Sequence, residues 1–131
     1  MMESKAQEII LDCEIKNIEK GSLKNLSIVK MSCNDIDVNF DIIDNINIFK
    51  ENEKVKMLLS KSKPIYTSND FCAHGYIVTE LKDTSITADA RYTMIISLFG
   101  LLVKISNKDS LLRLFQFHVM DHIYFCVKKN T

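Results

Sequence analysis

Residues 36–48 read IDVNFDIIDNINI, and this stretch decides the fold class. Apolar side chains occupy every second position, with Asp44 as the only break. Alternation with a period of two is typical of a half-buried β-strand, so we predict one long strand with a bulge or bend at Asp44. The other face carries acids and amides, which indicates an antiparallel sheet with one solvated side. The side chains expected to face the interior are Ile36, Val38, Phe40, Ile42, Ile46 and Ile48.

Short runs rich in β-branched and aromatic residues continue on both sides of this strand, separated by turn-prone clusters. We predict further strands at residues 9–18, 26–31, 55–59, 71–81, 84–88, 92–105 with a break near Gly100, and 123–127. A short helix is expected at residues 108–115, with Asp109 or Ser110 as its N-cap. About eight antiparallel strands favour a barrel or a sandwich, and the long interrupted strand favours the barrel because it can serve both halves of a coiled sheet.

The composition describes one globular domain, which we expect to span residues 1–131. Seventeen basic residues balance seventeen acidic ones, and Arg91 and Arg113 are the only arginines, which disfavours a nucleic-acid-binding surface. The longest apolar stretch, residues 94–103, is shorter than the roughly twenty residues that a membrane span needs. The N-terminal residues lack the apolar core of a secretory signal, so we expect an intracellular protein without a membrane partner.

The chain offers few residues for chemistry. Because the cysteines are scattered along the chain and the expected location is reducing, we interpret them as reduced, small apolar residues of the core. They are Cys13, Cys33, Cys72 and Cys126. His118, His122 and Cys126 are spaced four apart, but strand geometry would separate them by about 13 Å from one to the next. We therefore expect no metal and no other cofactor, and interpret His74 as a structural histidine. No nucleotide-binding or hydrolase motif is present in the sequence.

Two blocks of sequence resemble a known family. Residues 97–104 read SLFGLLVK, which resembles the pattern S-[YF]-G-G-L-L-M-R of the eighth subunit shared by the three nuclear RNA polymerases. In this chain Phe99 replaces the first glycine of that pattern. Residues 117–129, FHVMDHIYFCVKK, are similar to the family's C-terminal strand pair, which ends in V-Y-L-L-M-K-K.

Two upstream blocks follow in the same order. Residues 70–81, DFCAHGYIVTEL, resemble the family's E-Y-V-M-Y-G-K-V-Y strand, with His74 where a tyrosine is usual and Gly75 retained. Residues 44–49, DNINIF, resemble D-V-N-I-Q-I-Y. The main departure is the segment 61–69, which is far shorter than the family's polar loop at this place. Shortening a surface loop has a small thermodynamic effect, so the fold should be unaffected.

The resemblance implies an all-β, antiparallel eight-stranded barrel of the oligonucleotide/oligosaccharide-binding (OB) type. It also implies a non-catalytic structural and assembly subunit of DNA-directed RNA polymerases I, II and III, located in the nucleus, including the nucleolus. Such a subunit would dock on the largest polymerase subunit, without direct specific contact to nucleic acid and without a cofactor. The partner-binding residues expected from these blocks are Phe71, His74, Gly75, Tyr76, Phe99, Gly100, Leu101 and Leu102.

One alternative stays open: a freestanding barrel that binds single-stranded nucleic acid. Such proteins stack bases on exposed aromatic rings in a basic groove. The candidate rings are Phe49, Tyr66, Phe71, Tyr76, Tyr92 and Tyr124. The balanced charge weighs against this alternative, and co-purification of polymerase subunits or of nucleic acid would distinguish the two hypotheses.

Overall fold

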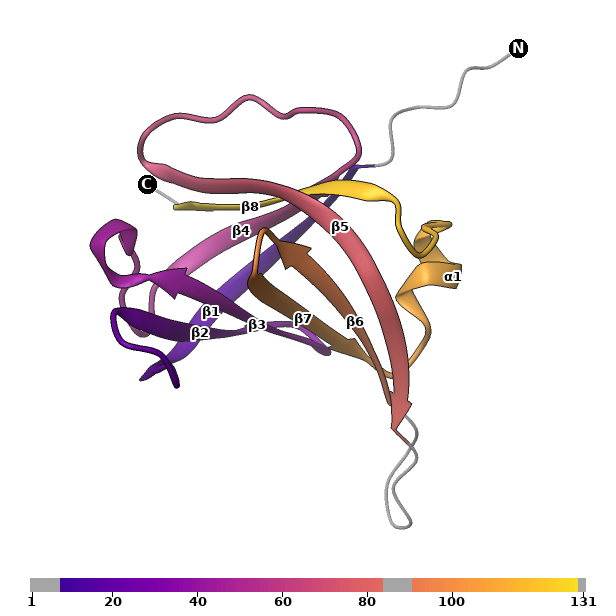
Figure 1. Ribbon diagram of the computed structural model, residues 1–131, viewed down its shortest axis with the longest axis horizontal. Helices are drawn as coiled ribbons and strands as arrows, with labels where there is room; N and C mark the ends of the chain where they lie inside the picture. The colour runs from indigo at the N-terminus through magenta and orange to yellow at the C-terminus, as the bar shows by residue number, and fades with distance from the viewer. Residues whose placement is uncertain (1–7, 84–90, 130–131) are drawn as a thin grey trace.

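The computed structural model describes residues 8–83 and 91–129, which form a closed antiparallel barrel (Figure 1). The strands are β1 (Glu8–Lys20), β2 (Leu26–Cys33), β3 (Ile36–Ile43), β4 (Lys54–Ser60), β5 (Asp70–Asp83), β6 (Arg91–Leu98), β7 (Leu101–Asn107) and β8 (His122–Lys129). Their order around the barrel is β1-β2-β3-β7-β6-β5-β8-β4. A 3₁₀ turn, η1 (Asp44–Ile46), follows β3, and a short helix, α1 (Leu111–Phe115), precedes β8. The expected eight-stranded barrel with one short helix is confirmed.

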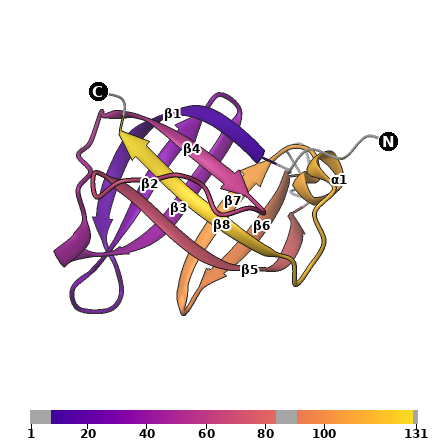
Figure 2. The same cartoon turned by 90° about the horizontal axis from the view of Figure 1, so that it is seen from above.

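The strand that serves both halves of the barrel is β5. Its first half pairs with β8 and its second half with β6, and both pairings meet at Tyr76. The register with β6 shifts between Ile77 and Thr79, which marks a β-bulge that lets the strand bend. Figure 1 shows β5 curving across the barrel from β8 to β6, and Figure 2 shows β8 lying between β4 and β5.

The prediction of one strand over residues 36–48 is wrong in its second half. β3 ends at Ile43, and Ile46 is 51% exposed rather than interior. Asp44 turns the chain because its backbone N–H donates to the carbonyl of Asn25 (2.9 Å) and its carboxylate accepts a hydrogen bond from Ser27 (2.5 Å). The first half is confirmed, since the side chains of Val38, Phe40 and Ile42 are buried. Ile36 and Ile48 are partly buried against the core.

The remaining expected elements agree with the barrel, with small shifts at their ends. The break near Gly100 is the turn between β6 and β7, where Phe99 (φ 55°) and Gly100 (φ 98°) both have positive φ. Positive φ at both central residues matches the twist of a two-residue hairpin. The helix is shorter than expected, and Ser110 caps it by accepting a hydrogen bond from the backbone N–H of Arg113 (3.2 Å). The strand expected at residues 84–88 lies outside the described residues.

The interpretation of the cysteines as reduced is wrong. Disulfides join Cys13 to Cys33 and Cys72 to Cys126. The first connects β1 with β2, and the second connects residues that lie directly opposite each other on β5 and β8. Each pair is made of cross-strand neighbours, with Cα atoms 4.2 and 4.0 Å apart, although 20 and 54 positions separate the partners in sequence. The scatter along the chain therefore concealed two adjacent pairs.

Candidate functional site

The most exposed aromatic side chain in the described part of the molecule lies at the tip of the β6–β7 hairpin. Phe99 is 86% exposed, and the neighbouring Leu102 is 37% exposed. The hairpin is anchored beside its tip because the carboxylate of Asp41 on β3 accepts a hydrogen bond from the backbone N–H of Leu102 (2.9 Å). The tip therefore presents its apolar side chains from a fixed base.

A groove of about 490 Å³ lies beside this tip. Its apolar lining includes Ile46, Ile48, Phe71, Leu98 and Leu101. The groove exists because β7 pairs with β3 only as far as the Phe40–Val103 pair, while β6 pairs with β5 only from Tyr76 onward. The hairpin tip thus stands apart from η1 and from the start of β5.

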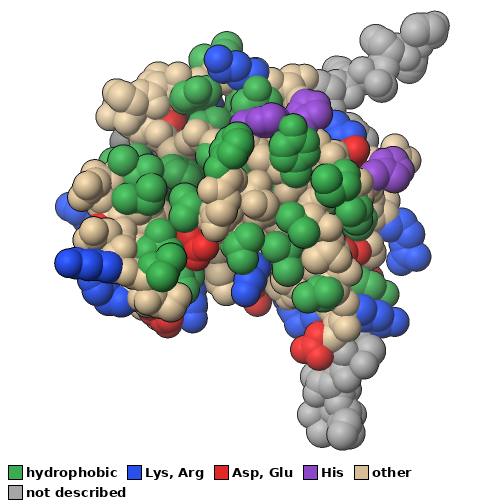
Figure 3. Space-filling view, viewed as in Figure 1, with side chains coloured by type: hydrophobic (Ala, Val, Ile, Leu, Met, Phe, Trp, Pro, Cys, Tyr) green, Lys and Arg blue, Asp and Glu red, His purple; other side chains and the backbone are tan. Residues whose placement is uncertain are grey.

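A cluster of aromatic rings continues this surface along β5 and β8. The Nε2 atom of His74 lies 3.2 Å from Nδ1 of His122, and the ring centroids of His74 and Tyr124 are 4.5 Å apart. Tyr76 is 46% exposed next to them. Figure 3 shows two adjoining histidine side chains surrounded by hydrophobic ones on this face of the molecule.

The eight expected partner-binding residues differ in how deeply they are buried. Tyr76, Phe99, Gly100 and Leu102 are exposed, and His74 and Leu101 are partly buried. Phe71 and Gly75 are buried, and the ring of Phe71 stacks on Phe40 in the core at 5.5 Å.

Sequence reasoning missed Ile46 and Ile48 as groove residues because it placed them on the long strand. It also missed the pairing of His74 with His122, which are 48 positions apart. The only available signal for Ile46 was the break in alternation at Asp44.

The arrangement does not support the proposed set of stacking platforms. Phe49 and Phe71 are 5% and 8% exposed and pack with Phe40 in the core, so they cannot stack on bases. The groove beside the hairpin has one carboxylate, from Asp70, and neither lysine nor arginine in its lining. This groove therefore offers no positively charged side chain to neutralise the phosphates of a nucleic acid.

The three residues considered as metal ligands are not brought together. Cys126 is in a disulfide, His122 contacts His74, and the backbone N–H of His118 donates to the carboxylate of Asp121 (2.8 Å). Within residues 8–83 and 91–129 no three histidine, cysteine or acidic side chains are grouped as metal ligands would be.

One carboxyl group has a perturbed pKa. The hydrogen bond from Lys61 to Asp121 (2.8 Å) lowers the pKa of that carboxyl below its ordinary value of 3.8. Partial burial acts in the opposite direction, and the hydrogen bond from the backbone of His118 adds to the lowering.

The described part of the chain also contains no helix of the length and hydrophobicity that a membrane-spanning helix needs.

A closed barrel with an exposed apolar hairpin tip and an adjoining groove falls in the class of β-barrels whose surface suits protein–protein contact. Residues 8–130 match the family of the G subunit of DNA-directed RNA polymerase, and the chain belongs to this family.

Relatives of which the alignment covers 96–100% carry the name DNA-directed RNA polymerase subunit Rpo8. The protein of Saccharolobus shibatae is 70% identical over 131 residues, covering 99% of this chain and 100% of the relative. That of Saccharolobus solfataricus is 67% identical over 132 residues, covering 100% of both chains. That of Sulfolobus acidocaldarius is 47% identical over 120 residues, covering 91% of this chain and 96% of the relative.

These relatives correct the expected location. The three organisms are archaea, which have no nucleus. The expectation of a nuclear and nucleolar protein is therefore wrong, although the polymerase family was identified from the sequence blocks.

Proposed function

We propose that this protein is a structural subunit of a DNA-directed RNA polymerase, without an active site of its own, and that it docks on the largest subunit. Membership of the polymerase G-subunit family and the names of the relatives support its place in a polymerase. The relatives are archaeal and do not support the expected assignment to three nuclear polymerases.

The observation that carries the docking proposal is the position of Phe99. A non-glycine residue at positive φ is uncommon, and an aromatic ring 86% exposed to water is unfavourable. Burial of the ring by a partner would remove its apolar surface from water and so stabilise a complex, and the positive φ of Phe99 belongs to the turn that presents the ring. The apolar groove beside the ring extends the surface that such a partner would cover.

The expected partner-binding residues have different roles in this proposal. Phe99, Leu102 and Tyr76 would contact the largest subunit directly, because they are exposed. Phe71 and Leu101 would form the groove wall, and His74 would contribute through its ring cluster. Gly100 would allow the tight turn of the hairpin. Gly75 would make no direct contact but would allow β5 and β6 to approach each other closely beneath the surface.

Reconstitution of the polymerase with subunit variants tests the proposal. Phe99→Asp and Leu102→Asp should abolish co-purification with the largest subunit, while the melting temperature of the free protein stays unchanged. Leu23→Asp is the matched control, since Leu23 is 69% exposed in the β1–β2 turn, and it should assemble normally. A photo-crosslinker at position 99 should attach to the largest subunit. Normal assembly of both hairpin variants, or crosslinking to a different subunit, would contradict the docking site.

The freestanding nucleic-acid-binding alternative has weaker support. Two of its six aromatic platforms lie in the core, and the formal charge of the chain is balanced. Fluorescence anisotropy with a labelled oligo-dT strand should show no saturable binding by the free protein at physiological salt.

A further inference from the structure

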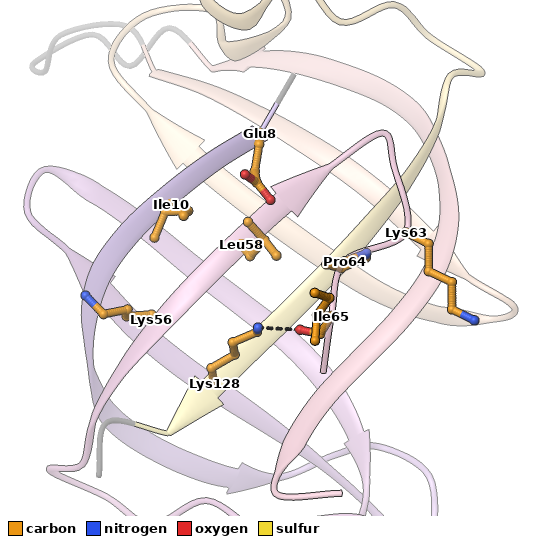
Figure 4. Close-up of a pocket in the computed structure, with 8 residues that line it drawn as sticks. All are labelled: Glu8, Ile10, Lys56, Leu58, Lys63, Pro64, Ile65 and Lys128. Carbon is orange, nitrogen blue, oxygen red and sulfur yellow. Dashed lines mark hydrogen bonds between the residues drawn. The ribbon is translucent and has the colours of Figure 1, made fainter. Parts of the chain in front are cut away.

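A second groove lies on the other side of the barrel from the β6–β7 hairpin. It is formed by the outer faces of β1, β4 and β8 and by the loop that joins β4 to β5, and its volume is about 490 Å³ (Figure 4). In the barrel order, β4 and β7 are separated by three strands in either direction. The groove would therefore remain accessible while the hairpin is engaged.

The centre of this groove is aliphatic. Ile10 on β1 is 57% exposed, and it lies next to Leu58 on β4 (Figure 4). Pro64 and Ile65 form the opposite wall, and Ile65 is 89% exposed. Two exposed isoleucines facing one hollow form an apolar surface that has no cover from the described residues.

Hydrogen bonds position the loop between β4 and β5 that forms one wall of this groove. The ammonium group of Lys128 on β8 donates a hydrogen bond to the carbonyl of Ile65 (2.6 Å), as Figure 4 shows. At the start of the loop, the hydroxyl of Ser60 donates to the carbonyl of Ser62 (2.7 Å). The Lys128 contact places Ile65 beside β8, and the Ser60 contact shapes the first residues of the loop.

The charges around the aliphatic centre are mainly positive. Lys56, Lys63, Lys128 and Glu8 line the groove. Asp12 neutralises Lys56 at 2.8 Å, but Lys128 contacts only a neutral carbonyl, and Lys63 has no partner among the described residues. Lys63 and Lys128 thus lack a carboxylate partner, while the carboxylate of Glu8 at the start of β1 has no cationic partner among the described residues, so the groove has a small positive excess. The groove beside the hairpin differs in this respect, because its only charged lining residue is Asp70.

We propose that this groove binds an acidic peptide segment of a partner protein, with an aliphatic side chain inserted between Ile10 and Ile65 and carboxylates facing Lys63 and Lys128. Charge complementarity selects the acidic residues, and the aliphatic centre requires an apolar anchor. A nucleic acid fits less well, since the groove has no arginine and no aromatic ring on which a base could stack.

Methyl NMR titration of the full-length protein tests this proposal. The probes are an acidic peptide, EDLDELE, its uncharged counterpart, QNLNQLQ, both blocked at their ends, and an oligo-dT strand. The acidic peptide should shift the methyl signals of Ile10, Leu58 and Ile65 in a saturable way, and the uncharged peptide should not. Lys63→Glu should weaken binding about fivefold, as expected for reversal of one exposed charge. Ile65→Ser should also weaken it.

Matched variants on the other side of the barrel serve as controls. Lys104→Glu changes an exposed lysine on β7 and should leave peptide binding unchanged. Phe99→Asp should also bind the peptide normally, which separates this proposal from the docking proposal. The inference is overturned by any of four results: no saturable shift at millimolar peptide, equal binding of both peptides, preferential binding of oligo-dT at these methyls, or concentration-dependent shifts without ligand that indicate self-association.

Discussion

The backbone carbonyl of Ser97 on β6 occupies the space that a Cβ atom at Gly75 on β5 would need. Gly75 lies one residue before Tyr76, where β5 exchanges its partner β8 for β6. The two strands approach each other closely at this exchange, and only a residue without a side chain allows it. The glycine retained in the family-like block therefore has a structural reason that is internal to the barrel.

We predict that Gly75→Ala lowers the free energy of unfolding by about 1–3 kcal/mol, the usual range for forcing an extra methyl group into a packed site. Urea denaturation of the purified protein measures this change. Ser97→Gly should not rescue the variant, because the obstructing atom belongs to the backbone. Unchanged stability of Gly75→Ala would show that β5 and β6 can separate without loss.

The aromatic core provides a second prediction. Phe40 is 1% exposed, and its ring contacts those of Phe49, Phe71 and Phe125. Phe40→Ala should therefore lower the free energy of unfolding by roughly 3–5 kcal/mol, because it removes buried surface and leaves a cavity. Asn39→Ala, on the outward face of the same strand, should stay within about 0.5 kcal/mol of the parent. Equal losses in denaturant titrations would mean that the faces of β3 are assigned incorrectly.

Local sequence patterns predicted the barrel because the core strands alternate with a period of two. Val38, Phe40 and Ile42 follow this rule, and their burial agrees with it. The same rule failed after Ile43, where the side chain of Asp44 contacts Ser27 and redirects the chain. Alternation continues through Ile46 and Ile48, which line the groove instead of continuing the strand, and apart from the break at Asp44 no local pattern distinguishes that continuation from a strand.

The proposed docking surface was only partly predictable, because it depends on pairings between distant residues. Family-like blocks identified the hairpin containing Phe99, but the groove also needs Ile46, which comes from a different strand connection. The disulfides escaped prediction for a similar reason. Cys72 and Cys126 become neighbours only when β5 and β8 pair in the observed register.

The contribution of each disulfide to stability should rise with the logarithm of the length of the loop that it closes. Replacing Cys72 and Cys126 with serine should cost about 2–4 kcal/mol, and replacing Cys13 and Cys33 should cost somewhat less. The difference, roughly 1 kcal/mol by the loop-entropy relation, follows from closing a segment of 54 rather than 20 residues. Urea denaturation of both double variants provides the comparison. Titration of the unfolded, unreduced protein should detect no free thiol at these four positions, and free thiols there would contradict the disulfide pairing.

The ion pair of Asp121 with Lys61 predicts how stability depends on pH. The carboxylate of Asp121 accepts hydrogen bonds from Lys61 and from the backbone of His118, both at 2.8 Å, and these lower its pKa. A carboxyl group whose pKa is lower in the folded state stabilises that state at pH values above its ordinary pKa of 3.8. This contribution is lost as the pH falls below 3.8 and through the lowered pKa of the folded state. Asp121→Asn should therefore be less stable than the parent at pH 7, and the difference should shrink as the pH falls below about 4. Urea denaturation at a series of pH values measures both effects.

Asp12→Asn is the matched control, because Asp12 also pairs with a lysine at 2.8 Å but lies on the exposed surface, where such pairs contribute little. If the two variants lose the same stability at pH 7, or if the loss in Asp121→Asn persists unchanged at acidic pH, the Lys61–Asp121 pair is not the source of the pH dependence.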